Sequence, residues 1–253
     1  MRMNKQIRRG CLVVCGLLVS PLILSASDTF PNLTVSEADK RRMLTKYIDA
    51  HGETRYQFNL EVFDQKLEAA WMRARNYPPT FTNVQEQAQT VQLVKFLIGL
   101  IAILTPQFEL SGDAALRAAR IYSMAYNLDL PEAFAVNPSH EKKEPQAIHY
   151  YELALKFNPN DAYAHWHYGA FLGSTDSLSK IQEGAAHLER AVALGLTPAM
   201  YSLGLVYLQL GNRKGAIESL ERYAQRTPSD KEAKKLLDTV RSSLIERVGT
   251  LRK

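Results

Sequence analysis

Apolar residues recur with helical spacing along most of the chain, and the clearest stretch covers residues 146–230. Helix-length apolar patterns alternate there with turns rich in Gly, Asn and Pro, and a similar helix pair returns along the stretch. A recurring unit of this size cannot bury its apolar face alone, so neighbouring copies must stack. The pattern therefore predicts an all-α protein built as a stack of helix-turn-helix repeats.

The most regular unit spans residues 197–230. Apolar and small residues recur at helical spacing on both of its helices, namely Met200, Leu203, Gly204, Tyr207, Ala216, Leu220 and Tyr223. Gly211 and Asn212 mark the turn between the helices, and Pro228 breaks the second helix before the next unit. We expect Gly204 and Ala216 where the two helices approach closely, because small side chains permit that approach.

This unit resembles a tetratricopeptide repeat, whose pattern is Trp-x-x-Leu-Gly-x-x-Tyr, then Ala-x-x-x-Phe, then Pro. Met200 occupies the Trp position and Leu220 the Phe position. The preceding unit is less regular, with a longer turn at residues 173–180, and its second half is also similar to Sel-like repeats. A third unit combines residues 113–128 with a helix starting near residue 146. The resemblance covers about 113–230 and implies an α-solenoid.

The resemblance also implies a partner-binding groove lined by the first helix of each unit. The groove-facing positions are mostly aromatic or aliphatic: Tyr163, Trp166, Ala170, Tyr201, Leu205, Leu208 and Gln209. Aromatic side chains give rigid contact area with a polar handle, which suits a protein or peptide partner. Apolar and aromatic residues also replace the Lys and Asn that some members use to clamp acidic chaperone tails. The alternative is that these side chains pack internally against the N-terminal helices or the end cap.

The N-terminal region, residues 28–110, is expected to be helical. Ser36 and Asp39 have capping-box spacing and open a predicted helix that ends near Gly52. Residues 54–62 alternate polar and apolar, which by itself indicates a strand. Apolar residues continue with helical spacing beyond them, so we expect a helix over about 58–76 instead.

The most apolar segment of this region is residues 91–104, in a helix capped by Asn83 and Glu86 and stopped by Pro106. It spans about 21 Å as a helix, short of the roughly 30 Å of a bilayer core. A buried core helix is therefore predicted. Association with a membrane through this segment is the alternative.

Residues 111–248 form the predicted repeat domain. A helix at 113–128 is followed by a proline-punctuated loop whose charged cluster at 141–144 either is solvated or frames a partner site. Ser229 and Glu232 have capping-box spacing before a last helix with an apolar face. This helix is the expected C-terminal cap of the repeat stack.

Charge and hydropathy single out residues 1–27. Four basic residues and no acidic residue precede an apolar run at 11–24, and small residues follow it. This is typical of a secretory signal peptide cleaved near Ala26 or Ser27, with an uncleaved anchor as the alternative. Removing those four charges takes the net charge from +5 to +1. The positive net charge is therefore no evidence that the protein binds nucleic acid.

Both cysteines, Cys11 and Cys15, lie in this segment. A mature chain without them forms no disulfide or thiolate zinc site and performs no cysteine catalysis. His165 and His167 are two apart on a helix, so they face different sides, and no HExxH motif occurs. No Gly-rich phosphate loop or nucleophile elbow is present either. We therefore predict no enzyme, no metal site and no cofactor.

Together these patterns predict an exported protein, periplasmic or secreted by a bacterium, that acts as a protein–protein interaction scaffold. Its groove would bind a peptide or a protein segment. The first alternative is an assembly factor anchored in the membrane through residues 91–104. The second is an enzyme with a site between the N-terminal helices and the repeats.

Overall fold

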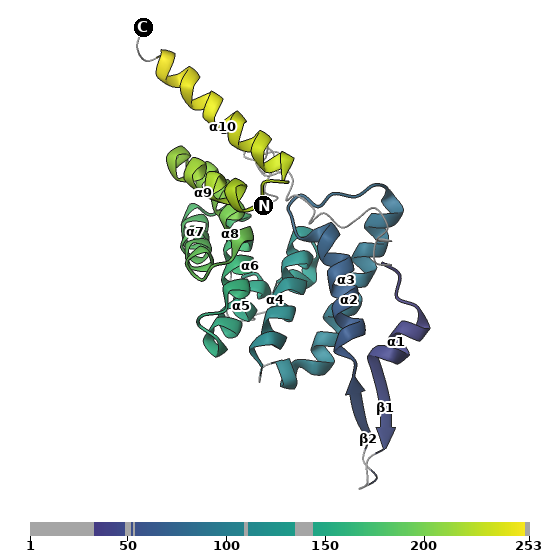
Figure 1. Ribbon diagram of the computed structural model, residues 1–253. Coiled ribbons are helices and arrows are strands. Elements are labelled where there is room, and N and C mark those ends of the chain that lie inside the picture. Colours follow the sequence, from purple (N-terminus) through teal and green to yellow (C-terminus); the bar gives the residue numbers. More distant parts are fainter. Residues whose placement is uncertain (1–32, 49–51, 53, 109–110, 135–143, 251–253) are drawn as a thin grey trace, which may run out of the picture. The chain divides into compact units, whose positions relative to one another are not determined.

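The computed structural model describes residues 33–48, 52, 54–108, 111–134 and 144–250 (Figure 1). The predicted signal peptide and most of the charged cluster at 141–144 lie outside these residues. The described chain is all-α apart from one β-hairpin, which confirms the predicted fold class. It divides into an N-terminal unit, Ser27–Phe157, and a C-terminal unit that contains Asn158–Lys253.

The N-terminal unit is a helical bundle with a hairpin. Its helices are α1 (Glu37–Met43), α2 (Leu60–Ala74), α3 (Val84–Phe108), α4 (Gly112–Asn127) and α5 (Gln146–Phe157). Leu93, Leu97 and Ile101 of α3 are fully buried, together with Phe63 of α2 and Met124 of α4. The apolar segment at 91–104 thus supplies core side chains, as predicted. Among the described residues, no helix is both long enough and apolar enough to cross a bilayer.

Polar contacts fasten α4 to α2. The Arg117 guanidinium donates to both carboxylate oxygens of Asp64, from Nε at 2.7 Å and from a terminal nitrogen at 2.8 Å. Asn127, buried on α4, donates to the backbone carbonyl of Ala74 at 2.9 Å. A bidentate arginine–carboxylate pair fixes orientation as well as distance. These contacts hold α4 in the same unit as α2, and the two units divide after Phe157. A repeat domain that begins at residue 111 stays a prediction.

Helices α4 and α5 pack as a pair, as the sequence analysis expected for the third repeat unit. The rings of Tyr122 and Tyr150 stack with centroids 5.3 Å apart. The buried hydroxyls of Ser123 and Tyr151 are hydrogen-bonded at 3.1 Å, and Ser123 also donates to the Ala119 carbonyl. The hydroxyls of Ser123 and Tyr151 are therefore both hydrogen-bonded in the buried contact between α4 and α5.

The hairpin corrects two predictions. Ser36 and Asp39 do form the capping box, but α1 ends at Met43. The chain then forms β1 (Leu44–Ile48), which pairs antiparallel with β2 (Thr54–Phe58), with Leu44 opposite Phe58. The predicted helix up to Gly52 is therefore wrong, and so is the preference for helix over strand at the start of residues 54–62. Helical structure begins at Leu60, where the Asn59 side chain accepts from the Glu61 and Val62 backbone amides.

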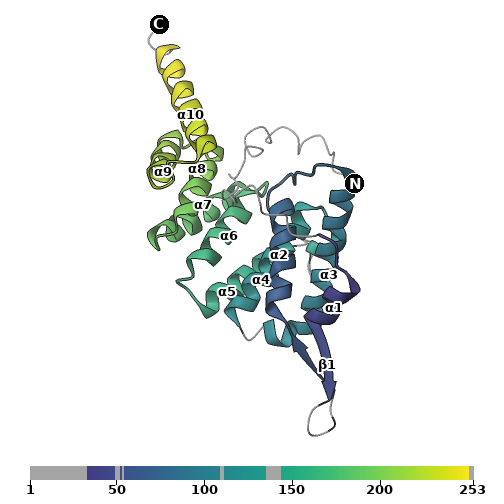
Figure 2. The same cartoon turned by 45° about the vertical axis from the view of Figure 1, so that its right-hand side comes forward.

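The C-terminal unit contains α6 (Ala162–Gly173), α7 (Leu178–Ala193), α8 (Thr197–Gln209), α9 (Arg213–Arg226) and α10 (Lys231–Thr250). Each helix packs against the next one along the chain (Figure 2). Gly204 lies at the crossing of α8 and α9, where an added Cβ would come within 2.7 Å of Leu220 Cγ. The close approach predicted at Gly204 is confirmed.

The start of α10 differs in detail from the prediction. Asp230, and not Ser229, caps the helix, because its carboxylate accepts from the Ala233 backbone amide at 3.0 Å. The same carboxyl group accepts from the Tyr223 hydroxyl at 3.0 Å, which ties the cap to α9. Ala233, Leu237 and Val240 are buried, so α10 covers the end of this unit with the face that the sequence indicated.

Candidate functional site

The predicted groove positions on α6 form an accessible aromatic surface. Tyr163 is 57% exposed, and Ala170 is also exposed. The rings of Tyr163 and Trp166 meet edge to face with centroids 6.3 Å apart. Trp166 is half-buried, and its indole N–H donates to the Ser202 hydroxyl at 2.9 Å. Because this bond fixes the indole, Tyr163, Trp166 and Ala170 present one ordered surface, called the α6 surface below.

The predicted groove positions on α8 lie in a different environment. Tyr201 is only 5% exposed, and its ring lies 5.3 Å from that of Tyr223. It belongs to an apolar cluster with Leu220 of α9 and Leu237 of α10, and Leu205 and Leu208 pack against that cluster. Gln209 is exposed. Internal packing against the end cap, the alternative raised by the sequence analysis, thus holds for Tyr201.

Burial and nearby charge act together on Tyr201. Burial, followed by the charge of Asp230, raises the pKa of Tyr201 to about 12. The hydroxyl therefore stays protonated at any physiological pH. Its role is to fill the junction between α8, α9 and α10, where a neutral aromatic side chain adds apolar contact.

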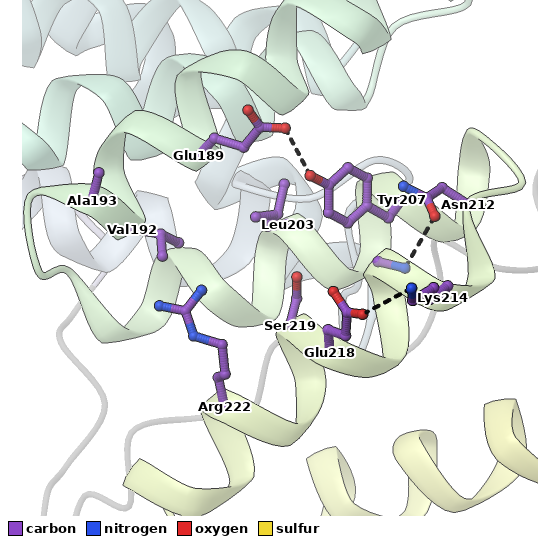
Figure 3. A pocket seen from close by; sticks show the side chains of 11 residues that line it. Glu189, Val192, Ala193, Leu203, Tyr207, Asn212, Lys214, Glu218, Ser219 and Arg222 are labelled. Atoms are coloured by element: carbon purple, nitrogen blue, oxygen red, sulfur yellow. Dashed lines mark hydrogen bonds and ion pairs between the residues drawn. The ribbon is translucent and has the colours of Figure 1, made fainter.

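A pocket of about 560 Å³ opens among α7, α8 and α9 (Figure 3). It is lined by residues of all three helices, namely Glu189, Val192, Ala193, Leu203, Tyr207, Asn212, Lys214, Gly215, Glu218, Ser219 and Arg222. None of them belongs to the predicted groove set. Leu203 and Tyr207 lie one helical turn apart on a face of α8 that the groove positions do not share. This concavity, called the α7–α9 pocket below, was not predicted from the sequence.

Polar contacts organise the side of the pocket next to α8. The Tyr207 hydroxyl donates to Glu189 Oε1 at 2.7 Å. Burial, and then this bond to Glu189, raises the pKa of Tyr207 to about 12, so the hydroxyl remains a donor. The Asn212 side chain caps α9 by accepting from the Gly215 amide at 3.0 Å. The pocket thus has a rigid rim that combines donors, acceptors and an apolar wall, a combination suited to binding a ligand.

Two histidines are paired between α6 and α7. His165 Nδ1 lies 2.9 Å from His187 Nδ1, and His165 Nε2 lies 3.0 Å from the Pro159 carbonyl oxygen. A carbonyl oxygen only accepts, so Nε2 of His165 carries the hydrogen, and its Nδ1 accepts from His187. Across the described residues, no group of three or more His, Cys, Asp or Glu side chains could hold a metal ion. The bond between the two rings links α6 and α7.

This pair gives the C-terminal unit a pH-dependent stability. Burial, followed by the charge of His165, lowers the pKa of His187 from 6.5, and Glu183 opposes the shift. The unfolded chain then binds more protons than the folded chain once the pH falls through 6.5. Stability is consequently lost on going from about pH 7.5 to about pH 5.5. We expect His187→Gln, which can still donate to His165, to reduce this loss.

Urea unfolding at both pH values would measure the effect, with Trp166 fluorescence followed in a Trp71→Phe background. His149→Gln is the matched control, because His149 is exposed on α5 in the other unit. An undiminished pH dependence in His187→Gln would show that His187 is not the titrating group.

Comparison with known proteins supports the repeat assignment for part of the chain. Residues 197–230 match the model of the tetratricopeptide repeat family, which confirms the repeat predicted at these residues. None of the curated proteins matches this sequence. Export and Sel-like character stay predictions.

Two solved structures are similar to this chain. One is TTC0263, a thermophilic tetratricopeptide-repeat protein of Thermus thermophilus, with 16% identity and a TM-score of 0.47 over 72% of this chain and 91% of that chain. The other is YrrB, described as a tetratricopeptide-repeat protein with an unusual peptide-binding site. It has 16% identity and a TM-score of 0.38 over 70% of this chain and 87% of that chain.

Proposed function

We propose that this protein is a non-catalytic protein–protein interaction scaffold that binds a protein or peptide segment through its α6 surface. The observation that carries the proposal is the tetratricopeptide repeat at residues 197–230, since stacked repeats of this kind serve as extended binding surfaces. The exposed aromatic pair of Tyr163 and Trp166 supports it, because aromatic residues dominate the energetics of binding surfaces.

The proposed location is the bacterial cell envelope, as a periplasmic or secreted protein. The basic start, the apolar run and the small residues near Ala26 support cleavage there. The absence of cysteine after Cys15 is compatible with an oxidising compartment, where an unpaired thiol would be reactive.

Crosslinking pull-down of the tagged protein from its native envelope tests partner and location together. We expect Tyr163→Ser combined with Ala170→Arg to reduce recovery of the crosslinked partners about tenfold or more, because it removes an aromatic anchor and places a charge on the α6 surface. Both positions are exposed, so the variant is expected to fold. Trp166 is left unchanged because of its bond to Ser202.

Ala186→Arg is the matched control, since Ala186 is exposed on α7 and is not one of the α6-surface residues. It should recover the same partners as the unmodified protein. Equal recovery by the α6-surface variant would contradict binding at this surface. Mass spectrometry of the same sample should find a mature chain that begins near Ser27, and an intact residue 1–27 segment would contradict cleavage.

A further inference from the structure

The α7–α9 pocket contains a cation and a hydroxyl that the fold does not use. Arg222 makes no ion pair and no hydrogen bond with the part of the chain that the structure describes. Ser219 lies one helical turn earlier on α9 and is only 6% exposed. Its hydroxyl likewise has no hydrogen-bond partner among the described residues. Because Ser219 lines the pocket, its hydroxyl is available to donate to a ligand that accepts a hydrogen bond there.

An apolar wall lies beside these two groups. Val192 of α7 and Leu203 of α8 line the pocket and are largely buried in the adjacent core cluster. Figure 3 shows Arg222 extending beneath Val192, with Ser219 below Leu203. An acceptor bound by Arg222 and Ser219 would therefore have apolar surface directly beside it.

The other end of the pocket is acidic. Glu218 faces Lys214 at 3.9 Å, but both side chains are largely exposed, so this pair is weak. Within the described residues, Glu189 accepts from Tyr207 through one carboxylate oxygen, and its other oxygen has no partner. The carboxylates of Glu189 and Glu218 disfavour binding of a polyanion such as nucleic acid. They favour a ligand that has a cationic group at this end and a carboxylate at the end near Arg222.

We propose that the α7–α9 pocket binds a short free peptide of two or three residues with both termini charged. Its carboxylate pairs with Arg222 and the Ser219 hydroxyl, its ammonium group lies near Glu218, and an apolar side chain packs on Val192 and Leu203. The volume of about 560 Å³ is within the range of small-ligand sites and exceeds what one amino acid fills. Charge-assisted hydrogen bonds from the Arg222 guanidinium to the peptide carboxylate fix the orientation of the peptide in the pocket. This site is separate from the α6 surface.

A ligand series tests the proposal without any substitution. Isothermal titration calorimetry of the full-length protein would compare the tripeptide Ala-Ala-Leu with its C-terminal amide, its N-acetyl form, the doubly blocked form and free leucine. We expect Ala-Ala-Leu to bind and amidation to weaken binding about ten- to hundredfold, the usual effect of losing a charge-assisted bond. Acetylation should weaken binding less, because Glu218 is exposed.

A variant at Arg222 tests the end that binds the carboxylate. Arg222→Gln should weaken binding of Ala-Ala-Leu by the same factor as amidation and leave the amide unaffected. Arg226→Gln, one turn further along α9 and outside the pocket, is the matched control and should bind like the unmodified protein. Four results would each overturn the proposal. The first is failure of Ala-Ala-Leu to bind, and the second is binding no tighter than that of its C-terminal amide. The third is equal weakening of binding by the two arginine variants, and the fourth is free leucine binding as tightly as the tripeptide. None of these outcomes bears on binding at the α6 surface.

Discussion

Replacing Phe63 with alanine is expected to lower the free energy of unfolding of the N-terminal unit by about 4 kcal/mol, the usual cost of removing a buried aromatic ring. Phe63 is 0% exposed on α2, and its ring meets that of Phe58 edge to face at 5.3 Å. The substitution removes apolar contact between α2 and β2 and leaves a cavity that the surrounding helices can fill only partly.

Urea unfolding followed by Trp71 fluorescence in a Trp166→Phe background would measure this loss. Leu60→Ala is the matched control, because Leu60 opens the same helix but is 49% exposed. It should change stability by less than about 1 kcal/mol. A similar loss in both variants would contradict the assignment of Phe63 to the core.

Gly169→Ala is expected to destabilise the C-terminal unit by about 3 kcal/mol, at the upper end of the usual cost of overpacking. An added Cβ would lie 2.6 Å from the Gly184 carbonyl oxygen and 3.0 Å from the Leu188 amide nitrogen. Those atoms are backbone, so α6 and α7 must move apart. Gly184 faces Gly169 in return, with its own Cβ position 2.8 Å from the Gly169 carbonyl oxygen.

The matched control is Gly99→Ala in the middle of α3, where a Cβ would meet nothing within 4 Å. It is expected to stabilise its unit by up to about 1 kcal/mol, because alanine is the better helix former. Trp166 and Trp71, each kept as the single tryptophan, report on the two units. A Gly169→Ala variant as stable as the unmodified protein would mean that α6 and α7 do not approach so closely.

The predictions that succeeded rest on local periodicity. Helix α3 and the α8–α9 pair were expected because apolar residues recur there on one face over several turns, and the caps at Asn83 and Asn212 mark where two of these helices begin. Such patterns need no knowledge of the partner, since any helix with one apolar face must bury it.

The predictions that failed depended on contacts distant along the chain. Tyr47 and Ile48 have helical spacing after Leu44, but they lie in β1 because β2 provides backbone partners for them. Gly52, between the two strands, has a φ of +79°. Pairing across a turn adds hydrogen bonds and favours aromatic and β-branched residues. The spacing within residues 44–48 is compatible with a helix, and only the pairing with β2 selects the strand.

The candidate site likewise has one part that could be expected from the sequence and one part that depends on tertiary packing. The resemblance to tetratricopeptide repeats implied that Tyr163, Trp166 and Ala170 lie on one surface, and α6 presents them there. The same resemblance placed Tyr201 in a groove, but packing of α10 against α8 and α9 buries it. The α7–α9 pocket had no signature, because Val192, Tyr207 and Arg222 belong to three helices and no motif joins them.

The sequence by itself therefore determined the helical class of this protein, its best-formed repeat at residues 197–230 and the core role of α3, because each follows from spacing within one helix or one helix pair. The aromatic face of α6 came from the resemblance to tetratricopeptide repeats. Only the tertiary structure decided the β-hairpin, the burial of Tyr201, the contact of Gly169 with Gly184 and the pocket lined by Arg222 and Ser219. The physical reason is that each of these depends on which surfaces meet across helices and strands.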